Sequence, residues 1–152
     1  MAAKKKYTYR MKNWILITLI FGLFTACTPA AEPVIFGEDM CAHCKMTIVD
    51  EPFAAELVTQ KGKVFKFDAI ECMMQFLQKK QSDNMALMLV RDYENPKEWQ
   101  DATQCNYLIS KELPSPMGAG LSAWLFKENA TAMQAQKGGE LYDWAGLKQQ
   151  FQ

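Results

Sequence analysis

Alternating and clustered apolar positions predict three strands in the first half of the chain. Residues 53–60 and 63–67 are rich in β-forming side chains, and the Lys61-Gly62 pair between them has turn chemistry. We therefore expect a hairpin. The continuous apolar run 85–90 is short enough to be a buried strand.

A helix is predicted between the hairpin and the third strand. Apolar residues recur at helical spacing up to the lysines at 79 and 80, at Ile70, Met73, Met74 and Leu77. Asp68 precedes this run. Glu71 stands three positions after Asp68, which is the spacing of a capping box. We expect Asp68 to cap the helix.

The second half repeats this order of elements. The pattern predicts two strands, a helix that ends at Gly138-Gly139, a short strand and a final helix capped by Asp143, at 106–109, 121–126, 130–136, 141–142 and up to Phe151. Each half is then strand, strand, helix, strand. An α+β domain fits this order with or without a duplication.

The N-terminal residues 1–26 have the pattern of an export signal. Five basic residues precede an uncharged, mostly apolar run at 14–26, which is shorter than the about 20 residues that span a bilayer. Small residues stand directly before Cys27, an arrangement that resembles the lipobox of bacterial lipoproteins. We expect cleavage before Cys27 and acylation of that cysteine. The alternative is an uncleaved anchor in which Cys27 is an ordinary thiol.

Charge and composition narrow the function classes. The chain has 17 basic and 17 acidic residues, and removal of 1–26 takes five of the bases, leaving 12 − 17 = −5. Such a body lacks the positive excess of a nucleic-acid-binding protein. The Pro- and Ala-containing stretch 27–37 is predicted to be the lipidated cysteine and a linker, followed by one domain at 38–152.

The strongest local motif is a pair of cysteines with a methionine close behind. Cys41 and Cys44 are three positions apart, and Met46 adds a thioether to the same short stretch. Thiolate and thioether sulfurs are soft donors that select Cu(I), and His43 can add a nitrogen. A plain disulfide and a core-filling Met46 are the alternatives.

Other uses of this cysteine spacing fit less well. Haem attachment needs a histidine directly after the second cysteine, where Lys45 stands. A thioredoxin-like pair opens a long helix, whereas the residues after Lys45 favour extended chain. Structural zinc needs further ligands, and we expect Cys72 and Cys105 to be buried, inert thiols instead.

A second irregular segment is the loop 113–120, which contains two prolines, two glycines and Met117. Neither helical nor strand periodicity places this methionine. It is either a lid over apolar surface or a ligand, and its own sequence context favours the lid.

Taken together, these motifs resemble the NosL family. The resemblance rests on Cys-x-x-Cys-x-Met-x-Ile at 41–48, Phe-Asp-Ala-Ile at 67–70, Pro-Met-Gly-Ala-Gly at 116–120, and Gly138-Gly139 before Trp144. It spans about residues 38–147. It implies two strand-strand-helix-strand units, similar to organomercurial lyase, with a C-terminal helix.

The resemblance also implies a function and a set of ligands. The family consists of lipid-anchored proteins that bind Cu(I) and pass it on during assembly of the copper centres of nitrous oxide reductase in denitrification, with the NosDFY transporter complex as partner. By position, Cys41, Cys44, Met46 and Met117 match its metal-binding motifs, while His43 lies in a variable pair. Lys45 stands where the family often has glycine.

We therefore expect a non-enzymatic copper chaperone that carries Cu(I) to apo nitrous oxide reductase. It would be exported and anchored through Cys27 to an envelope membrane, facing the periplasm. The alternative from another class is a thiol–disulfide oxidoreductase that uses Cys41 and Cys44. The two differ because disulfide exchange needs neither Met46 nor Met117.

Overall fold

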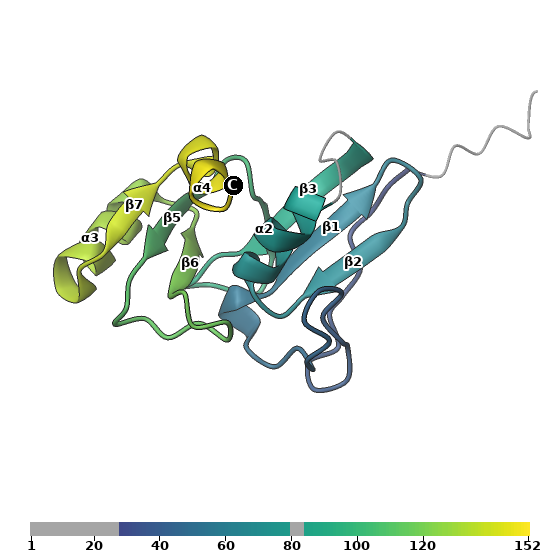
Figure 1. Ribbon diagram of the computed structural model, residues 1–152, viewed down its shortest axis with the longest axis horizontal. Coiled ribbons are helices and arrows are strands. Elements are labelled where there is room, and N and C mark those ends of the chain that lie inside the picture. Colours follow the sequence, from purple (N-terminus) through teal and green to yellow (C-terminus); the bar gives the residue numbers. More distant parts are fainter. Residues whose placement is uncertain (1–27, 80–83) are drawn as a thin grey trace, which may run out of the picture.

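The computed structural model describes residues 28–79 and 84–152, which form two antiparallel sheets with helices beside them (Figure 1). The signal peptide and the acylated Cys27 predicted above lie outside these residues. The first sheet has the strand order β2-β1-β3-β4, and its strands are β1 (Ala55–Thr59), β2 (Val64–Phe67), β3 (Met85–Arg91) and β4 (Trp99–Asp101). A short 3-10 helix, η1 (Glu51–Phe53), precedes β1.

The second sheet has the order β6-β5-β7. Its strands are β5 (Asn106–Ile109), β6 (Leu121–Trp124) and β7 (Glu140–Tyr142), and the helices of the fold are α2 (Ile70–Lys79), α3 (Lys127–Lys137) and α4 (Trp144–Gln150). Figure 1 shows α2 beside the first sheet and α3 beside the second. The two strand-strand-helix-strand units and the C-terminal helix are therefore confirmed.

The predicted hairpin is present in register. Leu57 of β1 lies opposite Phe65 of β2, and Gly62 in the connecting turn has a φ of 78°, a conformation that a glycine adopts without a Cβ clash. Asp143 caps α4 as predicted, because its Oδ1 accepts a hydrogen bond from the Gly146 amide at 2.7 Å.

Two predictions about the elements need correction, and one strand has no counterpart among them. Strand β4 is absent from the sequence prediction. Strand β3 is half-buried over its first five residues and buried only at Val90 and Arg91. The carboxylate of Asp68 accepts from the backbone amide of Val49 at 3.4 Å, and Glu71 is bound by Ser115. The expected capping box is therefore wrong, because tertiary contacts use both side chains.

The hydrophobic core joins the two sheets. Its largest cluster of buried side chains contains residues of both units, among them Leu57, Phe67, Met73, Tyr107 and Trp144. Cys41 and Cys72 belong to the same cluster. The site described below is thus built into the main core and not appended to it.

The segment predicted to be a linker is packed in its second half. The Glu32 amide donates to Oε1 of Glu56 at 3.0 Å, Lys66 Nζ donates to the Pro33 carbonyl at 2.8 Å, and Val34 is buried. The packed body therefore begins before residue 38.

Within the described residues, no helix is long and apolar enough to cross a membrane.

Candidate metal centre

The cysteine loop, residues 40–47, is a small hairpin of its own. Met40 and Thr47 form an antiparallel bridge, and the Cys41 amide donates to the Met46 carbonyl at 2.8 Å. This pairing closes the chain around Cys44 near the tip. The Cys41–Cys44 pair therefore sits in a tight loop and does not open a helix, unlike a thioredoxin-type redox pair.

Lys45 carries the sharpest part of this turn. Its φ is 67°, the left-handed region that favours glycine, and it is the only non-glycine residue with a positive φ among the described residues. The Lys45 amide donates to the Cys41 carbonyl at 3.1 Å, and its Nζ donates to the Ala42 carbonyl at 2.9 Å. Lysine therefore preserves the turn that a glycine at this position would form.

Helix α2 brings a third cysteine to this loop. The sulfur atoms of Cys41, Cys44 and Cys72 all lie within 4.8 Å of one another. Three sulfurs at about 2.3 Å from one ion lie roughly 4 Å apart, so this spacing suits a single metal ion. Cys72 is buried, as predicted, and it lies beside the thiols of Cys41 and Cys44.

The first turns of α2 and the cysteine loop meet in two places. Cys72 faces the thiols, and Gln75, three positions further on the same helix face, lies 2.8 Å from His43 through its Oε1 and the histidine Nε2. This hydrogen bond orients the imidazole ring of His43 so that Nε2 points toward Gln75. The structure does not bring His43 into the group of three thiols.

The surroundings of Cys41 favour its thiolate form. A hydrogen bond from the Cys72 thiol lowers the pKa of Cys41 to about 4, and the backbone amides of Asp68, Cys44 and His43 act in the same direction against burial. The hydrogen bond to Cys41, together with burial, raises the pKa of Cys72, and burial raises the pKa of Cys44. A thiolate held beside two thiols is a ready first ligand for a soft cation.

The two predicted thioethers lie at the surface. Met46 is 53% exposed and Met117 is 36% exposed, so neither fills the core, and the core-filling alternative for Met46 is wrong. Cys44 is half-buried, whereas Cys41 and Cys72 are fully buried. The sulfurs thus range from buried thiols to exposed thioethers.

The Pro–Met loop, residues 113–120, is tied to the first turn of α2. Ser115 Oγ donates to Oε1 of the buried Glu71 carboxyl and accepts from the Gly120 amide at 2.9 Å. Burial raises the pKa of Glu71, and the bond from Ser115 opposes that shift. The loop that carries Met117 therefore contacts the helix that carries Cys72.

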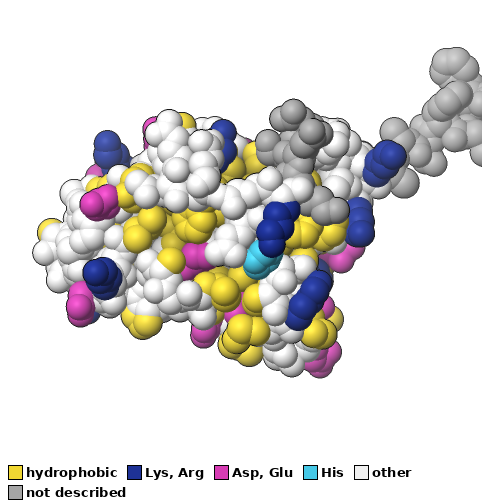
Figure 2. Space-filling model, in the orientation of Figure 1, with side chains coloured by type: hydrophobic (Ala, Val, Ile, Leu, Met, Phe, Trp, Pro, Cys, Tyr) yellow, Lys and Arg dark blue, Asp and Glu magenta, His cyan; other side chains and the backbone are white. Residues whose placement is uncertain are grey.

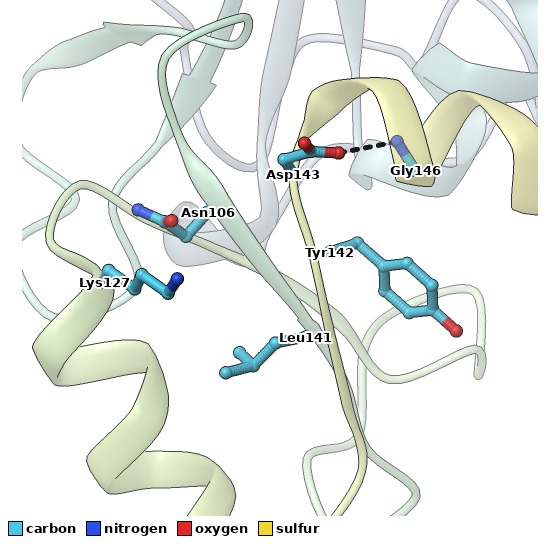
Figure 3. A pocket seen from close by; sticks show the side chains of 6 residues that line it. All are labelled: Asn106, Lys127, Leu141, Tyr142, Asp143 and Gly146. Carbon is cyan, nitrogen blue, oxygen red and sulfur yellow. Dashed lines mark hydrogen bonds between the residues drawn. The ribbon is translucent and has the colours of Figure 1, made fainter.

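Other features of the described residues are separate from this centre. Cys105 is buried outside the cluster, and burial raises its pKa to about 12, as suits the inert thiol predicted from sequence. A cavity of about 370 Å³ lies in the second unit, lined by Asn106, Lys127, Leu141, Tyr142, Asp143 and Gly146 (Figure 3). Its Asp143 is already engaged in capping α4.

Comparison with known proteins identifies the family. The sequence model of NosL matches residues 34–151. The chain belongs to the NosL family. A curated relative, the copper-binding lipoprotein NosL of Stutzerimonas stutzeri, is 30% identical over 142 residues, which cover 84% of this chain and 74% of the relative.

A solved NosL structure shares the fold. The crystal structure of the copper chaperone NosL from Shewanella denitrificans superposes with a TM-score of 0.71 at 22% identity, covering 81% of this chain and 98% of that one. The resemblance inferred from the cysteine and Pro-Met-Gly motifs is thereby confirmed. Cys72 lies in none of those motifs. The one sequence signal for it is its position in the first turn of the helix that begins at Ile70, where a side chain can face a neighbouring loop.

Proposed function

We propose that this NosL protein binds Cu(I) and delivers it for assembly of the copper centres of nitrous oxide reductase. The observation that carries the proposal is the group of three cysteine sulfurs within 4.8 Å. Sulfur donors favour Cu(I) over hard cations. The two NosL relatives, a copper-binding lipoprotein and a copper chaperone, support the same metal.

The proposed ligands are the thiols of Cys41, Cys44 and Cys72 together with the thioethers of Met46 and Met117. Cys44 is the central member, because it is half-buried, whereas Cys41 and Cys72 are buried and both methionines are exposed. Copper leaves by stepwise exchange, in which an incoming ligand reaches the ion from the exposed side while Cys44 still holds it. A fully enclosed four-coordinate site would not offer this route.

The surface around the cysteine loop suits a protein partner. Four exposed apolar side chains lie in the segment 35–49, namely Ile35, Met40, Met46 and Val49. Figure 2 shows hydrophobic side chains on the face that carries the histidine. We propose that apo nitrous oxide reductase and the NosDFY complex meet the protein here, with the chain held at an envelope membrane through acylated Cys27.

The metal preference is tested by titrating soluble residues 28–152 with Cu(I) and Zn(II) against chromophoric chelators. The donor set predicts tight Cu(I) binding and weak Zn(II) binding. Preference for Zn(II) would contradict the proposal. The anchor is tested by mass spectrometry of the membrane fraction, where an unmodified Cys27 or a different mature N-terminus would contradict lipidation.

Delivery is tested by the copper content of nitrous oxide reductase purified from cells under limiting copper. A Met46→Leu, Met117→Leu double variant keeps all thiols, and both sites are exposed enough to accept leucine at under about 1.5 kcal/mol. At normal protein level it should resemble a deletion strain, with copper-poor reductase and normal disulfide formation in other exported proteins.

The same variant separates the carrier from a thiol–disulfide oxidoreductase. Disulfide exchange by Cys41 and Cys44 needs no thioether, so the double variant would then load the reductase fully. The hairpin position of this cysteine pair, which does not open a helix, favours the carrier.

A further inference from the structure

Glu71 and Ser115 are a buried polar pair between two loops that both carry proposed ligands. Glu71 is 1% exposed and Ser115 is 8% exposed, and the serine Oγ donates to Oε1 of the carboxyl. The second carboxyl oxygen, Oε2, has no hydrogen-bond partner among the described residues. The backbone amides of Glu71, Leu121 and Ala119 lower the pKa of this carboxyl together with Ser115, but burial outweighs them. Burying a carboxyl with one oxygen unpartnered is costly for stability, which points to a role other than stabilising the core.

The position of Glu71 on α2 shows what that role can be. Successive residues on a helix point about 100° apart, so Glu71 and its neighbour Cys72 face different directions. Cys72 faces the cysteine loop, and Glu71 faces the Pro–Met loop. The first turn of α2 therefore holds one loop with a thiol and the other with a carboxyl.

Ser115 fixes the shape of the Pro–Met loop from its buried end. Its Oγ accepts from the Gly120 amide at 2.9 Å, and its carbonyl accepts from the Gly118 amide at 2.9 Å. These two bonds enclose Met117, which leaves its side chain at the surface. The bond to Glu71 then sets where this closed loop stands relative to α2.

We propose that Glu71 and Ser115 are positioning residues that hold Met117 in place toward the copper bound by the cysteines. The inference rests on the proposed function, because it takes Met117 as a copper ligand. Neither residue is itself a ligand. They act by removing the motion that the loop would otherwise lose when its thioether binds.

The test is a double-mutant cycle on Cu(I) affinity in soluble residues 28–152. Ser115→Ala removes the hydroxyl, and it is made in the parent and in Met117→Leu. Ser122→Ala is the matched control, since Ser122 is a fully buried serine on β6 that donates to the Leu108 carbonyl and accepts from Trp124 Nε1. Thermal unfolding of every variant separates folding from binding.

The inference predicts that Ser115→Ala weakens Cu(I) binding about 3- to 10-fold in the parent and less than about 2-fold in Met117→Leu. Ser122→Ala should change affinity less than about 2-fold in both backgrounds. Glu71→Gln keeps an oxygen that accepts from Ser115 and should bind as the parent does. Glu71→Leu removes it and should behave like Ser115→Ala, which provides a second disruptive variant.

Three results would overturn the inference, and each is distinguishable from failure of the proposed function. Equal weakening by Ser115→Ala in both backgrounds, or no weakening in the parent, would show that the pair does not act through Met117 while leaving the copper site intact. An unchanged affinity in Met117→Leu alone would remove the thioether from the ligand set, and the inference with it. Failure of the parent to bind Cu(I) would instead contradict the proposed function.

Discussion

The sulfur of Cys72, on the first turn of α2, lies within 4.8 Å of the sulfur of Cys41 in the cysteine loop. A hydrogen bond from the Cys72 thiol lowers the pKa of Cys41 to about 4. A helix and a loop from separate parts of the chain thus form one thiol group. This contact makes the cluster a three-sulfur site instead of a simple Cys-x-x-Cys pair.

Removal of single thiols should rank the ligands. Cys44→Ser should weaken Cu(I) binding most, and Cys72→Ser should also weaken it. Changes to outer-shell residues at metal sites typically cost about 10- to 100-fold in affinity, and loss of either thiol should cost at least as much. Cys105→Ser is the control, because Cys105 is buried outside the cluster. Competition titration measures all three, and a Cys72→Ser variant that binds like Cys105→Ser would exclude Cys72 as a ligand.

The left-handed backbone at Lys45 predicts that glycine is more stable than alanine at this position. A left-handed φ costs a residue with a Cβ about 1–2 kcal/mol, while the flexibility of glycine in the unfolded chain offsets about 0.5–1 kcal/mol. Lys45→Gly should therefore be more stable than Lys45→Ala by about 0.5–1 kcal/mol. Both variants lose the Nζ bond to Ala42, so their comparison in urea unfolding isolates the backbone. Equal stabilities would contradict the assigned turn.

The buried Glu56 should make stability depend on pH. Burial raises the pKa of this carboxyl from 4.5 to about 7, so between these values the folded state keeps a proton that the unfolded chain releases. Stability contributed by the protonated form is then complete below about pH 4.5 and is lost as the pH rises through 7.

Glu56→Gln should remove that loss, because an amide does not ionise and can still accept from the Glu32 amide. The difference in unfolding free energy between variant and parent should grow by about 1–3 kcal/mol from pH 5 to pH 8. Denaturant unfolding at several pH values measures it. A constant difference across this range would show that Glu56 titrates normally.

Two glycines of the Pro–Met loop offer a matched test of its packing. Both have a positive φ, 77° at Gly118 and 70° at Gly120, but a Cβ on Gly120 would lie 2.0 Å from the Ser110 carbonyl oxygen, whereas one on Gly118 meets nothing within 4 Å. Gly118→Ala should cost about 1–2 kcal/mol. Gly120→Ala should cost about 3 kcal/mol or more. Similar unfolding free energies for the two variants would contradict the close approach.

The sequence predicts the elements that local patterns define. The hairpin at Lys61-Gly62 and the Asp143 cap depend on residues close together in the chain, and both are confirmed. Strand β4 has no such signal, because it is three residues long and its Trp99 is placed by stacking on Arg91, with the guanidinium 4.0 Å from the ring centroid. Tertiary contact, not local preference, creates that strand.

The site shows the same division. Cys41, Cys44 and Met46 stand in one short motif, and Met117 is found through the family pattern. Cys72 carries no local signal of a metal role, since a helical cysteine among apolar residues is typical of a core, and the local signal at Glu71 indicated a capping box that the fold does not form. Their proposed roles depend on which loops pack on each side of α2, and the fold alone decides that.

X-ray absorption at the copper edge of soluble residues 28–152, loaded with one equivalent of Cu(I), tests the central claim most directly. The account predicts a first shell made only of thiolate and thioether sulfurs, at roughly 2.3 Å for the thiolates, with no nitrogen or oxygen. His43, engaged with Gln75, should contribute nothing. A first shell that contains imidazole nitrogen or oxygen donors would contradict the all-sulfur site.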